Sequence, residues 1–398
     1  RAAATAEGTY ETAPSGITLG SASAVMAKYV SGGMGFMGDM MRMIYTSPVE
    51  AAIPAPGTQT MYLHARFALM DRDVTGVVSA FYVQTLQLFQ YIADNYKTLI
   101  DDIECGSIHE DIKMPAEVRE TLLRRLEPMP ERAAELREIF KSGADFPFVT
   151  KIWPKITYLI GVGGDGFAIY SRTIKERFTN DSLHNVYSGV TASEGLWSIP
   201  VELESEDAAL APGSAFMEFL PVEAGNDFSK CVTMDQLEIG KTYELIITNL
   251  CGYYRYRMSD AVQVTGFYNT TPRVRFMYRV NKTVNLVGEK TTEKAMQLAV
   301  EKAAEELGFP LADYTMYPNQ TLVRPRYEFM IQPRVESDIE GISTEMLSQT
   351  IEKWLRHFNE EYGFAQIYAS NRIQPSVSYW LQPETTFLYR DLQIMKGA

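Results

Sequence analysis

Apolar residues recur with a helical period over residues 74–100. Leu86, Phe89 and Ile92 fall on one face of this stretch, which indicates one mostly buried helix. Core packing is the expected role of such a helix. The stretch therefore predicts a structural element and no site of its own.

The last third of the chain has a different pattern, in which helices alternate with short apolar strands. Amphipathic helices are expected at residues 292–307 and 344–361, with Thr291 as N-cap and Gly308 as stop of the first helix. Strands are expected at residues 283–287 and 327–333. Because both helices can cover the same sheet, this region predicts a small αβ sandwich.

The composition change sets the expected domain boundary. The fold class predicted is α/β, with a large domain over residues 1–279, a hinge at residues 280–282 and a small domain over residues 283–398. Within the large domain, residues 243–248 read as a buried strand.

Charge and composition exclude several function classes. The 398 residues are 46% hydrophobic and carry a formal net charge of −13, which disfavours binding to nucleic acid phosphates. The three cysteines have no metal-ligand or disulfide spacing, and no apolar stretch is long enough to cross a bilayer. A cytoplasmic protein without a membrane partner is expected, with a monomer as the default.

The first candidate site follows the strand at residues 243–248. The sequence YRYRMSD presents Tyr256, Arg257 and Asp260 in succession. A carboxylate in this position can accept hydrogen bonds from both hydroxyls of a ribose. The alternative is a surface hairpin, in which the arginines and Asp260 form solvated ion pairs.

The second candidate is VTASEG, residues 190–195. Thr191 and Ser193 can donate to phosphate oxygens, and Glu194 can take Mg²⁺ together with those phosphates. The alternative is a capping turn with an exposed glutamate. In the third candidate, Arg279 can neutralise phosphate charge through a bidentate contact.

Eight short motifs occur along the chain in a fixed order. They are YTSPVEA, QTMY, VTKIWP, TASEG, GKTYELIIT, GYYRYRMSD, VTGFYN and EKTTE. In order and approximate spacing the chain resembles the auxin-responsive Gretchen Hagen acyl acid amido synthetases, within the adenylate-forming superfamily. That resemblance implies a large α/β domain with a β-barrel portion and a small mobile αβ domain.

The resemblance also implies a two-step ligase. A carboxylic acid attacks ATP to give an acyl adenylate and pyrophosphate, and the amine of an amino acid then displaces AMP. By position, Glu194 would serve ATP and Mg²⁺, with Thr191 and Ser193 near the phosphates. Asp260 would serve the ribose and Arg279 the hinge side of the nucleotide, while Leu196 and Trp197 would shape the acyl pocket.

Four differences from the family pattern accompany the resemblance. A phosphate loop is expected before Arg1, and a lysine-containing segment is expected after Ala398. Val190 stands where an aromatic residue usually stacks on adenine, and Ser259 stands where a glycine precedes the ribose aspartate.

Two other functions stay open at this point. One is a ligase of the same chemistry that uses coenzyme A as acceptor. The other is a noncatalytic binding module that has kept the fold.

Overall fold

The computed structural model describes most of the chain, in two compact units. The described residues are 1–4, 10–12, 15, 18–20, 43–52, 58–162, 168–192, 194–280, 286, 291–322, 324–360, 362–363, 373–386 and 388–389. The first unit comprises Arg1–Ser188, Glu202–Ser205 and Arg390–Ala398, and the second comprises Gly189–Val201 and Glu206–Tyr389.

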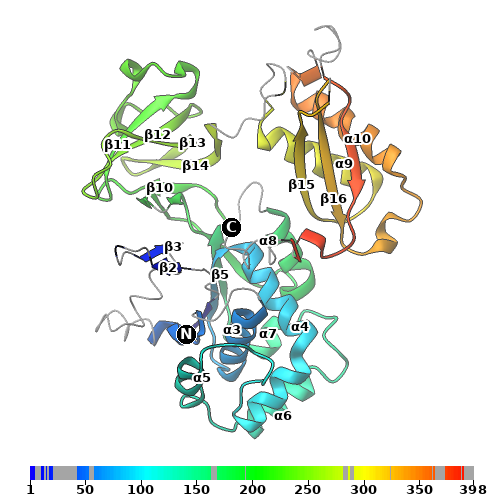
Figure 1. Cartoon of the computed structure of the whole chain (residues 1–398). Coiled ribbons are helices and arrows are strands. Elements are labelled where there is room, and N and C mark those ends of the chain that lie inside the picture. Colours follow the sequence, from blue (N-terminus) through cyan, green and yellow to red (C-terminus); the bar gives the residue numbers. More distant parts are fainter. Residues whose placement is uncertain are drawn as a thin grey trace. The chain divides into compact units, whose positions relative to one another are not determined.

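The first unit contains a parallel four-stranded sheet with the order β1-β4-β5-β6 (Figure 1). Its strands are β1 (Ala2–Ala4), β4 (Gly76–Phe81), β5 (Tyr158–Val162) and β6 (His184–Tyr187). Two short strands, β2 (Tyr10–Thr12) and β3 (Thr18–Gly20), form a separate hairpin.

The helices of this unit include one long buried helix, α4 (Tyr82–Cys105). Phe89 of α4 packs against Trp153 and Phe178, with ring centroids 6.4 and 5.8 Å apart. The other helical elements are η1 (Val49–Ala52), α3 (Thr58–Met70), α5 (Ala116–Leu123), α6 (Pro130–Ile139), α7 (Val149–Ile152), α8 (Ala168–Ile174) and a π-helical turn η3 (Lys175–Thr179).

The prediction of one helix over residues 74–100 was wrong in its first part. Residues 76–81 form strand β4, and the helix begins at Tyr82 and continues to Cys105. A short apolar run fits a buried parallel strand as well as a helix, so periodicity alone cannot separate the two. The side chain of Gln84 marks the boundary, because its Oε1 accepts hydrogen bonds from the backbone N–H groups of Ala80 and Phe81.

The second unit contains an antiparallel six-stranded sheet with the order β11-β12-β13-β14-β10-β9. The predicted strand at residues 243–248 is confirmed as β12. The strands are β9 (Ser198–Pro200), β10 (Ala208–Leu210), β11 (Phe216–Pro221), β12 (Thr242–Thr248), β13 (Tyr256–Tyr268) and β14 (Thr271–Arg279). Closure of this sheet into a β-barrel stays a prediction.

One face of the six-stranded sheet carries a hydrophobic core. It is built from alternating apolar positions of the long strands, as expected of a sheet buried on one side. Its buried members are Val190, Trp197, Leu210, Met217, Phe219, Leu237, Tyr243, Leu245, Ile247, Val262, Val264 and Val274. Short 3-10 turns, η4 (Val222–Ala224), η5 (Phe228–Lys230) and η6 (Met234–Gln236), join the strands β11 and β12.

The later part of the second unit forms a three-stranded sheet with two helices, as predicted for the small αβ region. Strands β15 (Leu311–Asn319) and β16 (Arg326–Pro333) are antiparallel, and β17 (Val377–Trp380) is parallel to β16. Helices α9 (Glu293–Leu307) and α10 (Thr344–Phe358) lie side by side (Figure 1), and a short turn η8 (Glu336–Ile339) precedes α10.

The helix ends in this region differ slightly from the sequence prediction. Thr292, not Thr291, is the N-cap of α9, and its side chain accepts a hydrogen bond from the N–H of Ala295. Thr291 instead accepts a hydrogen bond from the buried Asn359 at 2.8 Å. Gly308 ends α9 as predicted. The predicted strand at residues 283–287, apart from residue 286, and residues 281–282 of the predicted hinge lie outside the described residues.

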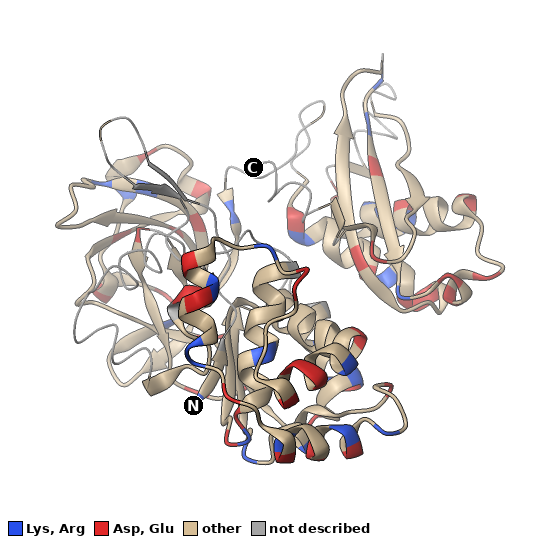
Figure 2. Ribbon diagram, turned by 60° about the horizontal axis from the view of Figure 1, so that its bottom comes forward, with Lys and Arg blue, Asp and Glu red and all other residues tan. Residues whose placement is uncertain are grey.

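Acidic and basic residues are interspersed along the described ribbon (Figure 2). On the helices of the first unit, for example, Arg137 pairs with Asp101 at 2.9 Å and with Glu104 at 2.7 Å. The charge of Arg137 is thus offset by carboxylates on a neighbouring helix. Among the described helices, none is long and apolar enough to span a membrane.

Candidate functional site

The turn that carries Glu194 lies between two short antiparallel strands in the second unit. Strand β7 (Thr191–Ala192) pairs with β8 (Gly195–Leu196), so that Thr191 lies opposite Leu196. Thr191 is exposed and Glu194 is partly exposed. Ser193, the remaining predicted phosphate contact, lies outside the described residues. The hairpin therefore offers a hydroxyl and a carboxylate to solvent.

The base of this hairpin is fixed by the backbone of Val190. The Val190 carbonyl accepts hydrogen bonds from the N–H groups of Trp197 and Ser198, at 2.9 and 3.2 Å. The Val190 N–H donates to the Ser198 hydroxyl at 2.7 Å. Val190 is buried in the core of the six-stranded sheet.

Asp260 is the most unusual of the predicted site residues, because its carboxylate is buried. Asp260 is only 4% exposed, and it pairs with Arg279 where strand β13 lies beside strand β14. Arg279 Nε lies 3.0 Å from Asp260 Oδ1, yet the N–H is not aligned for a hydrogen bond. Oδ1 is therefore a buried acceptor that lacks an aligned donor in the described part of the chain.

The surroundings of Asp260 favour its protonated form. Burial raises the pKa of the Asp260 carboxyl above its ordinary value, and the positive charge of Arg279 opposes that rise. The negative charges of Glu194 and Glu244 raise the pKa of Asp260 further. The contact that geometry provides between the two segments runs through strand β12, which pairs with the strand that carries Asp260.

A residue that the sequence analysis missed also joins the two segments. Asn249, directly after β12, donates from Nδ2 to the backbone carbonyl of Glu194 at 3.4 Å. Its Oδ1 accepts from the N–H groups of Cys251 and Tyr253, at 3.0 and 3.3 Å. An asparagine directly after a buried strand is a turn signal, which was the only hint in the sequence.

The strand that presents Asp260 is irregular just before it. Ser259 has φ +59°, in the left-handed region that favours glycine. The β12–β13 register shifts here, because Glu244 pairs with Ala261 while Ile246 pairs with Arg257. Such bulges redirect side chains and occur often beside active sites. The glycine expected here by resemblance would fit this backbone without strain.

The two arginines of the YRYRMSD segment have structural partners. Arg257 donates two hydrogen bonds to the buried Glu244, one of them at 2.8 Å, and Arg255 pairs with Glu218 at 2.9 Å. Both guanidinium groups also lie over the ring of Phe228, 5.4 and 5.6 Å from its centroid. The arginines therefore pair with glutamates and not with Asp260, and Arg257 and Asp260 each belong to an ion pair whose carboxylate is buried.

The remaining predicted residues differ in how accessible they are. Tyr256 is 40% exposed, and its ring centroid lies 4.7 Å from that of Tyr253. Leu196 is 43% exposed, whereas Trp197 is 1% exposed in the core. The alternation of a strand explains the contrast, because successive side chains point to opposite faces.

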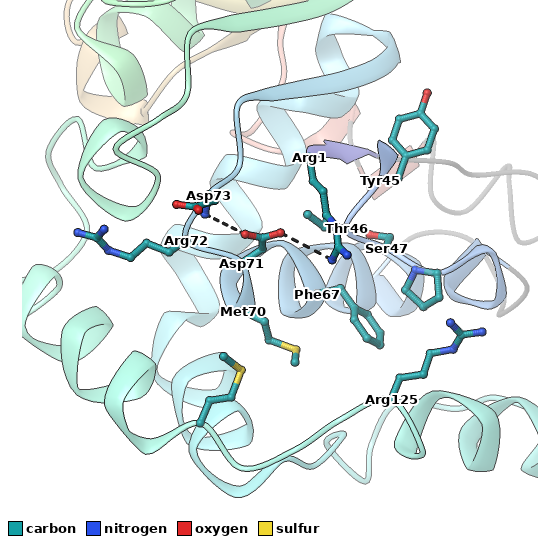
Figure 3. Close-up of a pocket in the computed structure, with 12 residues that line it drawn as sticks. Arg1, Tyr45, Thr46, Ser47, Phe67, Met70, Asp71, Arg72, Asp73 and Arg125 are labelled. Atoms are coloured by element: carbon teal, nitrogen blue, oxygen red, sulfur yellow. Dashed lines mark hydrogen bonds and ion pairs between the residues drawn. The ribbon is translucent and has the colours of Figure 1, made fainter. Parts of the chain in front are cut away.

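A cavity of about 710 Å³ lies in the first unit (Figure 3). Arg1, Phe67 and Met70 line it, and Arg1 approaches Asp71 at 3.9 Å. Its other arginines are engaged: Arg72 pairs with Glu135, and Arg125 with Glu50. A ligand anion would have to compete with these pairs, so the cavity gives no candidate anion site.

Comparison with known proteins identifies a family along most of the chain. The model of the GH3 family N-terminal domain matches residues 3–183, and that of the GH3 family central domain matches residues 208–279. A probable indole-3-acetic acid-amido synthetase GH3.1 from Arabidopsis thaliana is 29% identical over 364 residues, which cover 89% of this chain and 60% of the relative. The indole-3-acetic acid-amido synthetase GH3.8 from Oryza sativa subsp. indica is 33% identical over 283 residues, which cover 68% of this chain and 46% of that relative.

The fold is also shared with a solved structure. The GH3.15 acyl acid amido synthetase superposes with a TM-score of 0.81 at 19% identity, over 100% of this chain and 68% of the other. The chain thus has the mixed α/β fold of these enzymes and spans 60% or less of the two curated relatives above. On the two matching domain models, this chain belongs to the GH3 family.

Proposed function

We propose that this chain belongs to an ATP-dependent ligase that adenylates a carboxylic acid and transfers the acyl group to an amino acid. Family membership supports the reaction class. The observation that carries the proposal is the buried Asp260 Oδ1, which has no aligned hydrogen-bond donor among the described residues, on a strand whose neighbour β12 leads into Asn249, the donor to the Glu194 carbonyl. Two carboxylates so arranged suit the two ends of one nucleotide.

Asp260 is the proposed contact for the ribose. Its Oδ1 is a buried acceptor without an aligned donor in the described residues, so a ribose hydroxyl would supply the missing hydrogen bond. Tyr256, partly exposed on the same strand, is proposed to line the nucleotide. Ribose hydroxyls would also compensate the cost that burial imposes on the Asp260 carboxylate.

Glu194 is the proposed ligand of Mg²⁺, with Thr191 and Ser193 donating to phosphate oxygens. Within the described residues, no group of three or more His, Cys, Asp and Glu side chains is arranged to hold a metal ion. A single carboxylate still suits Mg²⁺, which keeps several waters and takes its other oxygens from substrate phosphates. When bound, Mg²⁺ supplies positive charge that stabilises the developing charge at phosphorus.

Arg279 is proposed to move from Asp260 to the phosphate side of the nucleotide. Its side chain is 54% exposed and its contact with Asp260 is not an aligned hydrogen bond, so the guanidinium can reach solvent once another group satisfies the buried carboxylate. Once ribose hydroxyls satisfy Asp260, the guanidinium is free to offset phosphate charge.

The acyl acid is proposed to lie near Leu196 and Trp197. Leu196 is exposed and available for direct contact, whereas Trp197 lies in the core beneath the turn. The acceptor of the acyl group is proposed to be an amino acid. A small domain over residues 283–398 is proposed to rotate between the half-reactions about a hinge at residues 280–282. A cytoplasmic monomer remains the working assumption.

Carboxylic-acid-dependent release of pyrophosphate from ATP tests this function. The purified chain is assayed with a panel of carboxylic acids, then with amino acids or coenzyme A as acceptor. We expect Asp260→Asn and Glu194→Gln each to lower kcat/KM by about tenfold to a hundredfold, since each removes a charge-assisted contact. Glu223→Gln, an exposed carboxylate of the same unit, is the matched control. Undiminished release by Asp260→Asn would refute the assignment.

A further inference from the structure

Gly195, directly after Glu194, lies against the ring of a buried tryptophan. A Cβ added at Gly195 would lie 2.6 Å from Cη2 and 2.9 Å from Cζ3 of Trp197. Side-chain carbons do not approach each other so closely, so the glycine is what allows the backbone to touch the indole. The turn that carries Glu194 therefore rests directly on the ring of Trp197.

Trp197 is fixed firmly from below. The side chain is 1% exposed within the core of the six-stranded sheet. Its backbone N–H donates to the Val190 carbonyl at 2.9 Å, and its carbonyl accepts from the N–H of Ala211 at 2.8 Å. The indole N–H has no hydrogen-bond partner among the described residues, so packing alone orients the ring.

The turn above the ring is held much less firmly. Glu194 is partly exposed, and the hydrogen bond from Asn249 to its carbonyl is long at 3.4 Å. Because the interior is close-packed and the ring cannot shift without displacing the core, a collision at residue 195 would displace the turn instead. The indole ring thus limits where the backbone next to Glu194 can lie.

We infer that Trp197 is a positioning residue. Its ring supports the turn at Gly195 and thereby fixes where Glu194 lies relative to Asp260. This inference rests on the proposed function, in which Glu194 binds the Mg²⁺ of Mg-ATP. It assigns Trp197 a role beneath the site, in addition to any effect on the acyl pocket. A clash of one methyl group should therefore impair nucleotide binding without removing any ligand group.

Size complementation between residues 195 and 197 tests the inference. The variants are Gly195→Ala, Trp197→Phe and the double variant, in which the shorter phenyl ring removes the atoms that a methyl group at residue 195 would meet. Gly266→Ala is the matched control, because a Cβ there meets no atom within 4 Å and the glycine lies in strand β13 of the same sheet. Affinity for Mg-ATP is measured by calorimetry, and hydrogen exchange is measured on the peptide spanning residues 190–196.

We expect Gly195→Ala to weaken Mg-ATP binding by on the order of tenfold to a hundredfold and to speed exchange in the turn. The double variant should return to within about twofold of Trp197→Phe alone. Losses that multiply in the double variant, or unchanged exchange in Gly195→Ala, would overturn the inference. Hydrogen exchange needs no ligand, so it tests whether Trp197 supports the turn even if the parent chain does not bind Mg-ATP. A parent chain that does not bind Mg-ATP would count against the proposed function alone.

Discussion

Replacing Arg257 by methionine should destabilise the second unit far more than the same change at Arg255. Both arginines belong to one segment, and each pairs with a glutamate and lies over Phe228. They differ in the burial of their partners. The side chain of Glu244 is 2% exposed, whereas that of Glu218 is 16% exposed.

The expected magnitudes follow from that burial. Arg257→Met leaves a buried carboxylate without its counter-ion, which costs about 3–5 kcal/mol. Arg255→Met breaks a more exposed pair, in which solvent screens the charges, and should cost much less. Methionine keeps an apolar contact with Phe228 in both variants, so the loss of the cation–π contact is common to both. A difference of about 2 kcal/mol is roughly 30-fold in the unfolding equilibrium.

Urea unfolding of the two variants beside the parent chain measures this difference. Adding Glu244→Gln to Arg257→Met should recover much of the loss, because the amide is far less costly to bury than the carboxylate. Equal losses from the two arginine variants would refute the reasoning. So would a double variant that is no more stable than Arg257→Met alone, since the buried charge would then not be the cause.

Three further predictions concern single positions. Because burial raises the pKa of Asp260, its contribution to stability is present below the unfolded carboxyl pKa and is lost as the pH rises through the folded value. As the pH is lowered, protonation of Asp260 should weaken Mg-ATP binding, and it should do so at a higher pH than protonation of an ordinary carboxyl would. Calorimetry at several pH values should find no such decrease in affinity in Asp260→Asn. Ser259→Gly should stabilise the chain by about 1 kcal/mol, since it relieves φ +59°; a lower urea midpoint would contradict this. Gly76→Ala should cost about 1–3 kcal/mol, because its Cβ would lie 2.2 Å from the Tyr158 ring. Tyr158→Leu should relieve that loss, and strictly additive losses in thermal unfolding would contradict the clash.

The sequence predicted elements well where a pattern was long and local. Strands β12 and β16 and helices α9 and α10 occur within three residues of their expected bounds. Each combines an apolar period with a capping or turn residue, so local and tertiary preferences agree. Strand β4 was missed because its short apolar run joins α4 without a turn residue.

The site was predictable by residue type but not by contact. The segment YRYRMSD suggested one cluster of Arg257 with Asp260, whereas the structure pairs Arg257 with Glu244 and Asp260 with Arg279. Pairing across strands depends on register, and a bulge changes register in a way that no local pattern records. A glutamate within an otherwise buried strand was the available signal for Glu244, because a buried charge needs a partner.

Two local departures from regular geometry therefore define the candidate site. The left-handed Ser259 lies beside Asp260, and the glycine contact with Trp197 lies beside Glu194. Each of these backbone conformations is strained or restricted, and it persists only because the surrounding sheet holds it in place. The sheet does so through the core beneath Trp197 and the ladder that joins Asp260 to Arg279. Since Asp260 lies in the six-stranded sheet and the turn of Glu194 rests on Trp197 in the core of that sheet, a change to this core should alter Mg-ATP binding before it alters the fold of the first unit.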